Sequence, residues 1–560
     1  MNRELFGVFG DIDTFNRFRS NDAFDEVVTG PSLTVGVRDP DLGEPGWSAL
    51  CATDDGFCLI WGEIFVPDDD TNAARWLLER YPEHGRDALS QLNGSYVAVL
   101  DSASANEAFV ATDPVRSRAC FYTDEGGTRR FGTDASQIAQ SVDNPTLDRN
   151  GILEFLHLGV TLGEKSALEE IQRLPIDSCL RSKTVEDLER FVYDPREFDY
   201  VDELAQRLER ALRRRRVLPG KKGILLSAGY DSRVILSRIP DIERSYTVGA
   251  PAAQEVQGAK RLSEQYDVTH TAFEPDERYL RADESKIRYG QGIKESLHIH
   301  HAGYTDEFDV DTVYHGLLCD TFFRGHFNAE QSVDVLGKRV PTGRVETDPE
   351  PAEVLLRKFG YTRDASLDLT DRMDFNVDPR SFVRETLNDQ LEEKETRAKT
   401  VQNRLNCVGI ANQPSVPFHD HLSDHFLTSF LAIDRELIEW HLQTPPAYRT
   451  TETFLAACTQ LDDDILEHRP PDRPHDTMLL NEIERFVRRK TPFLASFQPP
   501  WPDRQTLFER HDYDQRLLAD VEHVHDLPAR HKLRLIDLRT WLGYWRNSGD
   551  QSLPWLENSN

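Results

Sequence analysis

The sequence Gly223-Ile224-Leu225-Leu226-Ser227-Ala228-Gly229-Tyr230-Asp231-Ser232 decides the fold of the central part of this chain. Glycine and apolar residues at 223–226 predict a buried strand, and the small polar residues at 227–232 predict a loop that leads into a helix from Arg233. Such a loop presents backbone N–H groups and the positive end of the helix dipole to an anion. Phosphate is therefore the expected ligand.

The individual residues of the loop have distinct chemistry. Ser227 and Ser232 supply hydroxyl donors, and Gly229 allows close approach to the backbone. Asp231 can hold Mg²⁺, which proteins bind through one or two carboxylates together with substrate phosphates. The loop lacks the lysine of the GxxxxGK[ST] motif, which argues against an ordinary kinase or ATPase that cleaves the β–γ bond. Since small polar residues after a strand often form only a helix cap, the loop alone is weak evidence.

The segments after the loop continue the alternation of strand and helix. The pattern predicts a strand at 245–248, a helix at 252–266 and a strand at 268–273. This succession is typical of an α/β fold with a doubly wound parallel sheet.

A helix is also expected before the loop, with Asp202 as its cap and Pro219-Gly220 as its stop. Its apolar stripe is Leu204, Leu208, Ala211 and Leu212. The helix contains the arginine run 213–216, which we interpret as a solvated face. The alternative is that this run raises the electrostatic potential near a phosphate site one strand away.

The N-terminal part of the chain has a different pattern. From Leu5 to about Gln140, the apolar runs are short and bounded by Gly, Pro and Asp, which is typical of antiparallel strands. Helical stretches at 71–80 and 87–92 interrupt them. An α+β arrangement, with helices that cover sheet, is therefore expected rather than a barrel.

The boundary between the two patterns is expected at 143–150, which contains Pro145. We therefore predict one domain at 1–145 and a second at 146–560. Beyond about residue 330 the second domain is expected to be mostly helical, with one long charged helix at 381–405.

Several stretches together resemble the asparagine synthetase family. Residues 223–235 are similar to the pyrophosphate loop of N-type ATP pyrophosphatases, Ser-Gly-Gly-x-Asp-Ser, with Ala228 in place of one glycine. The stretch 246–251 resembles the family segment that follows this loop. Gly-Leu-Leu-Cys-Asp-Thr-Phe-Phe-Arg-Gly at 316–325 resembles Gly-Glu-Gly-Ser-Asp-Glu-x-Phe-Gly-Gly, and Val-Pro-Phe-His-Asp at 416–420 resembles Val-Pro-Phe-Leu-Asp. The order and separation of the motifs agree with the family.

This resemblance implies a fold, a reaction and its cofactors. The family adenylates a carboxylate with ATP, releases pyrophosphate and lets an amine attack the acyl-adenylate, so ATP and Mg²⁺ are the implied cofactors. Asp231 and Asp320 would be the catalytic residues and would share the magnesium ions. A helix-start aspartate without a ligand is the alternative for Asp320. The implied ligands of ATP and pyrophosphate are Leu226, Ser227, Gly229, Asp231, Ser232, Val248 and Gly316.

The N-terminal region resembles the Ntn glutaminase domain of the glutamine-using members. Similar motifs are found at 61–65, 92–96 and 112–114. The nucleophilic cysteine that follows the initiator methionine is replaced by Asn2, and Trp61 replaces the asparagine expected at the oxyanion position. A carboxamide is not a nucleophile, so we expect an inactive glutaminase-like domain and nitrogen from ammonia or from the substrate's own amine.

The synthetase-like region also departs from the family. Leu317, Thr321 and Gln413 stand where the family has glutamates, so the carboxylates on the amine side are altered. Where the family often has Arg-x-Lys, this chain has no lysine within residues 467–473, and Arg473 could replace only the charge because arginine does not exchange protons. His298, His300 and His301 match no known metal-site spacing, and we interpret them as loop histidines.

Composition limits the partners. The chain has 97 acidic and 66 basic residues, a net charge of −31, which argues against general affinity for nucleic acid or anionic membranes. Of the basic residues 53 are arginine and 13 lysine, a balance that we interpret as halophilic. Seven cysteines without a CxxC pair favour a reducing compartment, and neither a signal peptide nor an apolar span of 18 residues is evident. We expect a cytoplasmic protein.

The sequence thus predicts an ATP-dependent, AMP-forming amide ligase that joins a small-molecule carboxylate to ammonia or an amine. Two alternatives stay open. One is intramolecular amide formation in the manner of β-lactam synthetase, and the other is a catalytically silent scaffold that keeps nucleotide binding or only the fold. The acceptor is not defined by the residues, and assembly into a homodimer is left open.

Overall fold

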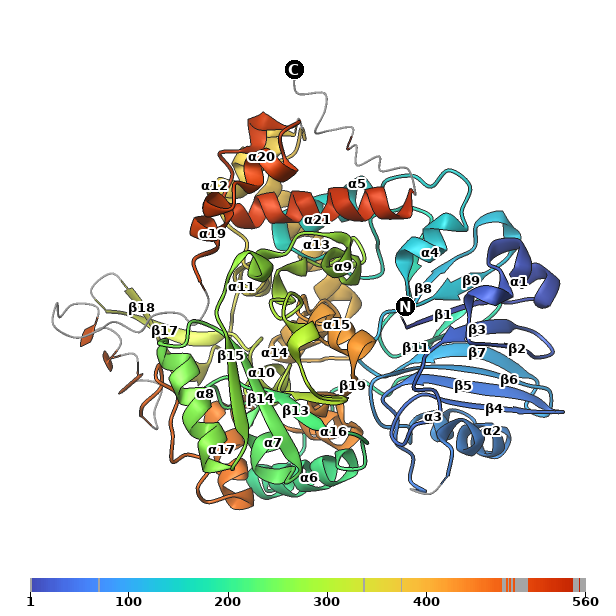
Figure 1. The fold of residues 1–560 in the computed structure, drawn as a ribbon, viewed down its shortest axis with the longest axis horizontal. Coiled ribbons are helices and arrows are strands. Elements are labelled where there is room, and N and C mark those ends of the chain that lie inside the picture. The colour runs from blue at the N-terminus through green and yellow to red at the C-terminus, as the bar shows by residue number, and fades with distance from the viewer. Residues whose placement is uncertain are drawn as a thin grey trace.

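The fold was obtained as a computed structural model (Figure 1). It describes residues 3–68, 71–335, 338–373, 375–475, 480–481, 483–484, 487–488, 502–546 and 553. Two antiparallel sheets lie in the N-terminal region and one parallel sheet lies in the centre of the chain. Among the described helices, none has both the length and the apolar content needed to cross a bilayer.

The two N-terminal sheets pack face to face. The first has the order β10 (Gln172–Arg173), β8 (Phe121–Thr123), β9 (Arg130–Gly132), β1 (Glu4–Val8), β3 (Thr34–Arg38) and β2 (Glu26–Thr29). The second has the order β12 (Val185–Asp187), β11 (Ser178–Leu180), β7 (Glu107–Thr112), β6 (Tyr96–Ser102), β5 (Gly56–Gly62) and β4 (Ala49–Thr53). Leu5 and Val35 of one sheet and Leu59 and Val97 of the other share one buried cluster. This cluster is the core between the sheets.

Helices cover the outer faces of both sheets. Helices α2 (Ala73–His84) and α3 (Arg86–Leu89) pack on the second sheet, where Leu77 and Ile60 share a buried cluster. Helices α4 (Ala135–Gln140) and α5 (Arg149–Leu158) cover the first. The predicted α+β layers are therefore present.

The antiparallel sheets also recruit strands from beyond residue 145. Strands β10, β11 and β12 lie at 172–187, where β10 pairs with β8 and β11 pairs with β7. The sequence analysis did not predict these strands because they are only two or three residues long. The layered region therefore includes residues on both sides of the expected boundary.

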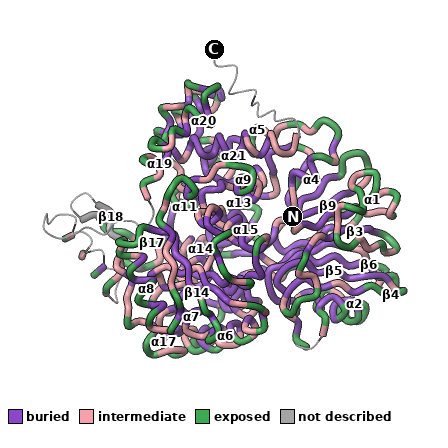
Figure 2. The backbone as a smooth tube through the Cα atoms, viewed as in Figure 1, coloured by how far each residue is buried: buried purple, intermediate pink, exposed green. Residues whose placement is uncertain are grey.

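The central sheet is parallel throughout. Its order is β15 (Thr269–Phe273), β14 (Ile242–Val248), β13 (Lys222–Leu225), β16 (Thr312–His315) and β19 (Leu427–Phe430). Ile224 and Tyr314 belong to a core shared with α6 (Tyr200–Arg215) and α7 (Arg233–Arg238). Val313 belongs to a core on the other side, shared with α15 (Pro417–His425). The sheet therefore lies between two buried cores, and buried residues are frequent along its strands (Figure 2).

Two details of the predicted helices are wrong. The cap of α6 is Asp199, whose carboxylate accepts from the N–H groups of Val201 and Asp202, so Asp202 lies in the first turn. The long helix expected at 381–405 is two helices, α13 (Pro379–Glu393) and α14 (Val401–Ala411). The second begins afresh because Thr400 Oγ1 accepts from Asn403 N at 3.3 Å.

The other described elements are a hairpin and further helices. The hairpin is β17 (Glu330–Val335) and β18 (Lys338–Val345). The helices are α1 (Ile12–Phe18), α8 (Gln254–Gln265), α9 (Glu284–Ile287), α10 (Cys319–Phe323), α11 (Pro351–Lys358), α12 (Arg363–Arg372), α16 (Arg435–Gln443), α17 (Thr451–Leu461), α19 (Arg504–Arg510), α20 (Tyr513–Leu517) and α21 (Ala529–Trp545). Helix α21 packs against α4, α5 and α9 and so ties the end of the chain to both regions (Figure 1).

Candidate functional site

The order of the parallel sheet creates a crevice between β13 and β16. The chain proceeds from β13 toward β14 on one side and from β16 toward β19 on the other, so the connections leave these neighbouring strands in opposite directions. In open α/β sheets, ligands bind outside the carboxyl ends of strands at such a switch point. The predicted loop 227–232 follows β13, and Gly316 follows β16. The sheet therefore brings the two motifs to one place.

The two loops are in close contact. A Cβ atom built on Gly316 would lie 2.7 Å from Asp231 C and 2.7 Å from Ser232 N. Only glycine permits this approach of the two backbones. Gly316 is thus required by packing against Asp231, which places the start of the β16 loop beside the predicted phosphate loop.

Asp231 and Asp320 are held at the crevice by basic side chains. Arg324 Nη1 lies 2.6 Å from Asp231 Oδ1, and His326 Nδ1 lies 3.2 Å from Asp320 Oδ2. The two carboxylate side chains keep 28% and 42% of their surface exposed, so both can reach a ligand. Asp320 is in the first turn of the short helix α10.

The two carboxyl groups differ in their expected protonation. Burial raises the pKa of Asp231, and the nearby negative charge of Asp320 adds to this, although Arg324 opposes both. Burial also acts to raise the pKa of Asp320, but the hydrogen bond and charge of His326, with the charge of Arg324, hold it below its ordinary value. Asp320 is therefore the more readily ionised member of an acidic pair.

This donor set fits a magnesium ion. Mg²⁺ is usually held by one or two carboxylates and completes its shell with phosphate oxygens and water. Asp231 and Asp320 could supply the two carboxylates, and the ion pair of Arg324 engages only Oδ1 of Asp231. Among the described residues, no cluster of three or more His, Cys, Asp or Glu side chains forms a metal site. A magnesium ion here would therefore depend on oxygens from its phosphate ligand.

The predicted phosphate loop contains two hydrogen bonds that the sequence analysis did not predict. Ala228 N donates to Glu255 Oε1 at 2.8 Å, and Gly229 N donates to Ser227 Oγ at 3.1 Å. Burial raises the pKa of Glu255, which lies in the first turn of α8. A phosphate at this loop would compete with Glu255 for the Ala228 N–H. An acidic residue that opens the helix after the next strand was the available signal.

A pocket of about 260 Å³ lies beside the acidic pair, and several cationic side chains line it. Asp320 and Tyr230 line one side. The cationic side chains are Arg324, Arg344, Lys358, Arg449 and Arg473, and the carboxylates Asp320, Glu330 and Glu452 also line the pocket. The Arg473 guanidinium lies 5.9 Å from the centre of the Tyr230 ring, so the arginine proposed as a replacement charge is beside the loop. The excess of positive charge suits a polyanion.

The remaining predicted ligands line the crevice less directly. Leu226 and Val248 are 3% and 4% exposed at the ends of β13 and β14, and Ser232 is 5% exposed at the start of α7. Ser227 retains partial exposure. The structure therefore brings the predicted residues together at one end of the sheet, but Leu226, Val248 and Ser232 would meet a ligand mainly through their backbone.

Two of the residues that depart from the family contact each other. Gln413 Nε2 donates to Thr321 Oγ1 at 3.1 Å, and both residues are buried. The two uncharged side chains therefore satisfy one another where the resemblance implied two carboxylates. A site for an incoming amine would lack negative charge at this point.

The three histidines lie away from the crevice. His301 is 0% exposed, and its ring lies against the rings of Phe418 and His421 of α15. Burial lowers the pKa of His301 and of His300, the latter to about 3. His298 instead lies 3.3 Å from Glu295. These contacts place His301 in the core against α15, whereas His300 is half-buried.

Trp61, at the expected oxyanion position, lies in a stack of tryptophan and arginine side chains. The Arg118 guanidinium lies 4.6 Å from the Trp61 ring centre and 5.3 Å from that of Trp47. Arg3 lies 5.1 Å from the Trp47 ring and pairs with Asp39 at 2.8 Å. Asn2 lies outside the described residues. Trp61 is therefore fixed in a tryptophan–arginine stack.

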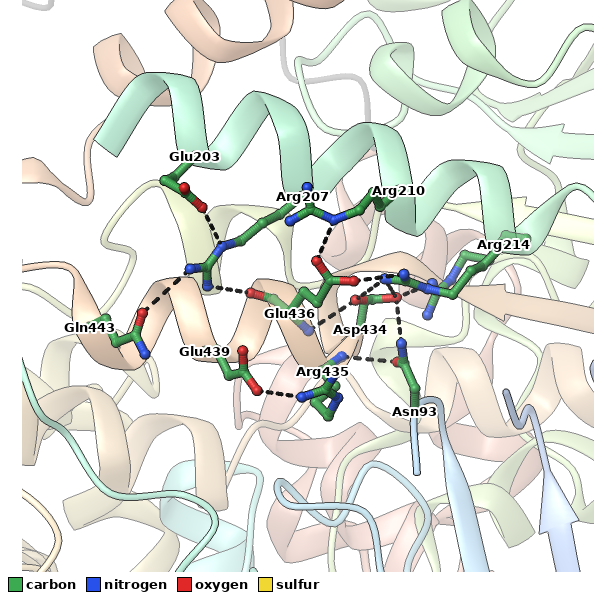
Figure 3. Close-up of polar contacts among 11 residues, drawn as sticks. Asn93, Glu203, Arg207, Arg210, Arg214, Asp434, Arg435, Glu436, Glu439 and Gln443 are labelled. Carbon is green, nitrogen blue, oxygen red and sulfur yellow. Dashed lines mark hydrogen bonds and ion pairs between the residues drawn. The ribbon is translucent and has the colours of Figure 1, made fainter. Parts of the chain in front are cut away.

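Part of the arginine run 213–216 is buried, contrary to the solvated face that we expected. Arg215 is 0% exposed and pairs with Asp434 at 2.6 Å and with Glu63 at 3.3 Å. Arg214 also reaches Asp434, which accepts a hydrogen bond from Asn93 of the N-terminal region (Figure 3). Arg214 and Arg215 therefore connect α6 to the N-terminal region. Arg215 pairs directly with Glu63 of the motif at 61–65, and Asp434 links both arginines to Asn93 of the motif at 92–96.

Comparisons with known proteins support the character of the N-terminal region. Residues 62–191 match the family model described as glutamine amidotransferase domain. No curated protein matches the chain. Similar solved structures include one titled as the allosteric regulatory enzyme of purine biosynthesis, with 9% identity, 67% of this chain and 93% of that chain covered, and a TM-score of 0.22.

A second similar structure is the glutamine phosphoribosylpyrophosphate amidotransferase from B. subtilis in complex with ADP and GMP. It has 10% identity, covers 67% of this chain and 94% of that chain, and has a TM-score of 0.20. Structural likenesses this low carry no argument about the fold. The family match indicates a glutamine-amidotransferase-type domain within residues 62–191.

Proposed function

We propose that the chain is an ATP-dependent, AMP-forming amide ligase that adenylates a carboxylate and transfers ammonia or an amine to it. The observation that carries this proposal is the meeting of Asp231 and Asp320 at the switch point of the parallel sheet, beside a pocket with cationic walls. The resemblance of both motifs to the asparagine synthetase family supports the reaction type.

In this proposal each residue has a task that follows from its position. A carboxylate oxygen of the acceptor attacks the α-phosphorus of ATP, and pyrophosphate leaves with the electrons of the broken P–O bond. Arg324 and Arg473 place positive charge beside that leaving group, which is where charge develops. Asp231 and Asp320 would hold Mg²⁺, which when bound neutralises charge on the phosphates.

The second half of the reaction forms the amide. The amine attacks the acyl carbon, AMP leaves, and the nitrogen gives up a proton. Because Arg473 cannot accept that proton, it passes to solvent or to the leaving phosphate. We propose ammonia or the substrate's own amine as the nitrogen source, since Trp61 lies in its stack with Arg118 at the expected oxyanion position.

Two observations favour the alternatives. The uncharged pair Gln413 and Thr321 leaves the amine side without the two expected carboxylates, which suits amide formation within one substrate. The Glu255 carboxylate on the Ala228 N–H suits a scaffold that no longer binds phosphate there. The scaffold is separated from the main proposal by the absence of acid-dependent ATP cleavage. Amide formation within one substrate also releases AMP, and it is separated by whether an amide forms without added ammonia or amine.

The test is to incubate the protein with MgATP and a panel of carboxylic acids at molar salt, and to measure AMP, ADP and pyrophosphate exchange. We expect AMP and acid-dependent exchange. Asp231→Asn and Asp320→Asn should each slow adenylation by about 10²- to 10³-fold, the usual cost of one charge-stabilising group. Asp526→Asn is the matched control, because Asp526 is 88% exposed and remote from the crevice.

ADP as the product would contradict the proposal. Absence of exchange with every acid, in the wild type as in Asp231→Asn, would favour the scaffold. Exchange that proceeds at the wild-type rate in either aspartate variant would show that the site is assigned incorrectly.

A further inference from the structure

A continuous chain of buried hydrogen bonds joins the N-terminal sheets to the end of strand β16. Asp113 Oδ2 lies 2.7 Å from Ser117 Oγ, which lies 2.7 Å from Ser95 Oγ. Ser95 Oγ lies 3.2 Å from His419 Nε2, and His419 Nδ1 lies 3.0 Å from His315 Nε2. None of these five residues is more than 2% exposed. The chain is therefore shielded from solvent along its whole length.

One backbone group reveals the direction of every bond in the structure. Leu317 N can only donate, and it lies 3.3 Å from His315 Nδ1, so that nitrogen accepts. In a neutral imidazole the other nitrogen then carries the proton, so His315 Nε2 donates to His419 Nδ1. By the same reasoning, His419 Nε2 donates to Ser95 Oγ. Ser95 Oγ then donates to Ser117 Oγ, and Ser117 Oγ donates to Asp113.

The other end of the chain requires the same direction. An ionised Asp113 can only accept, and it already accepts from the N–H groups of Val115 and Ser117. The reverse direction would turn His315 Nδ1–H against the N–H of Leu317. Both imidazoles are expected to be neutral, because burial lowers the pKa of His315, to about 3, and of His419. The rings of Phe418 and Phe430 lie beside His315, and the charge of Arg118 adds to burial in lowering the pKa of His419.

The hydrogen-bond chain ends at the crevice between β13 and β16. His315 is the last residue of β16, and Gly316 lies against Asp231. The backbone of Leu318 has a φ of 64°, a left-handed conformation that residues other than glycine rarely adopt. Asp320 follows two residues later. The orientation of the 316–317 peptide therefore decides where this strained turn places Asp320.

We propose that the Asp113–His315 chain is a positioning device, in which the N-terminal region fixes the tautomers of His419 and His315 and thereby the peptide that carries Asp320 into the cleft. These are positioning residues, since they act through the backbone. The chain does not conduct protons, because it ends at a backbone amide. Its effect on nucleotide binding rests on the proposed function, whereas its effect on the tautomers does not.

Two variants are designed to disturb the direction of the chain. In Asp113→Asn the carbonyl oxygen can keep the backbone N–H groups while the amide NH₂ donates to Ser117, which reverses every later bond. Ser117→Ala removes the link and frees Ser95 to donate to His419. Ser102→Ala is the matched control, because Ser102 is a buried serine of β6 whose hydroxyl donates to Asp55 at 2.8 Å, outside the chain.

The test combines ¹⁵N histidine NMR, amide hydrogen exchange and MgATP titration on the full-length protein. In the wild type we expect protons on Nε2 of both His315 and His419. In Asp113→Asn we expect them on Nδ1, with exchange of the 316–320 amides faster by about tenfold. MgATP affinity should fall by about three- to tenfold in both variants and stay unchanged in Ser102→Ala.

A proton on Nδ1 of either histidine in the wild type would overturn the proposal. So would tautomers and exchange rates in Asp113→Asn and Ser117→Ala that equal those of Ser102→Ala. If the wild type fails to bind MgATP while tautomers and exchange respond as expected, the positioning chain stands and the proposed function fails.

Discussion

Replacement of Arg215 by alanine tests the contact between the two regions of the chain most directly. Arg215, Glu63 and Asp434 all have wholly buried side chains. The guanidinium lies 2.6 Å from Asp434 and 3.3 Å from Glu63. Its removal leaves Glu63 without its cationic partner in the interior, whereas Asp434 keeps Arg214 at 2.8 Å.

The expected loss follows from the buried charge that is left behind. Removal of one partner from a buried ion pair destabilises proteins by about 3–5 kcal/mol, because an uncompensated charge remains. Arg213→Ala, two positions earlier on the exposed face of α6, should change the free energy of unfolding by less than about 0.5 kcal/mol. The two variants remove the same side chain from the same helix, so helix propensity cancels.

The dependence on pH provides a second readout. Burial acts to raise the pKa of Asp434, but the charges of Arg215 and Arg214 hold it below its ordinary value. A carboxyl group with a lowered folded pKa stabilises the protein above its unfolded pKa of about 3.9 and loses this contribution as the pH falls toward the folded pKa. The difference between wild type and Arg215→Ala should therefore shrink in acid.

Equilibrium unfolding by denaturant at constant high salt, followed by circular dichroism, measures these differences. The variant Glu63→Gln/Arg215→Met/Asp434→Asn removes all three charges and should recover much of the loss. If Arg215→Ala unfolds at the same denaturant concentration as Arg213→Ala, the buried ion pairs of Arg215 with Glu63 and Asp434 do not stabilise the fold.

Two further variants probe the cleft and the N-terminal region. Gly316→Ala should destabilise the protein by about 1–3 kcal/mol and weaken MgATP binding, because its Cβ would lie 2.7 Å from the Asp231 backbone; denaturant unfolding and ligand titration measure both, and Gly290→Ala, whose Cβ meets nothing within 4 Å, is the control. Equal behaviour of the two glycine variants would refute the close approach. Glutamine should not replace ammonia, and Asn2→Cys alone should not release glutamate while Trp61 stays stacked on Arg118; a coupled glutamate assay in which the wild type releases glutamate would contradict this.

The parts of the fold that local patterns encode could be predicted from the sequence. The segment from β13 to β15 alternates strand and helix over consecutive residues, and its apolar periodicity is clear. Strands β16 and β19 were not predicted, because no clear local alternation of strand and helix surrounds them as it does the equally short β13, and β19 lies more than a hundred residues after its partner. The break between α13 and α14 escaped because no glycine or proline marks it; the capping by Thr400 does.

The candidate site shows the same division. Asp231 and Asp320 could be proposed as partners from motif resemblance, and the sheet order brings their loops together. Arg215 could not be assigned, because its role depends on Glu63 and Asp434, which are distant in sequence. For Glu255 the position at the start of a helix was a signal, but its partner, the loop amide of Ala228, was not predictable. From the sequence alone, a charged residue on a helix is predicted to be solvent-exposed, because its distant partners are not known.

The pairing of β16 with β19 has a consequence for synthesis of the chain. The antiparallel sheets can close once residue 187 has left the ribosome, whereas the parallel sheet waits for β19 at 427–430. Non-local pairing of this kind is slow and leaves partly folded surfaces exposed. During that interval the nascent N-terminal region presents Glu63, Asn93 and Ser95 before Asp434 and His419 exist, so it offers a finished template on which the later half assembles.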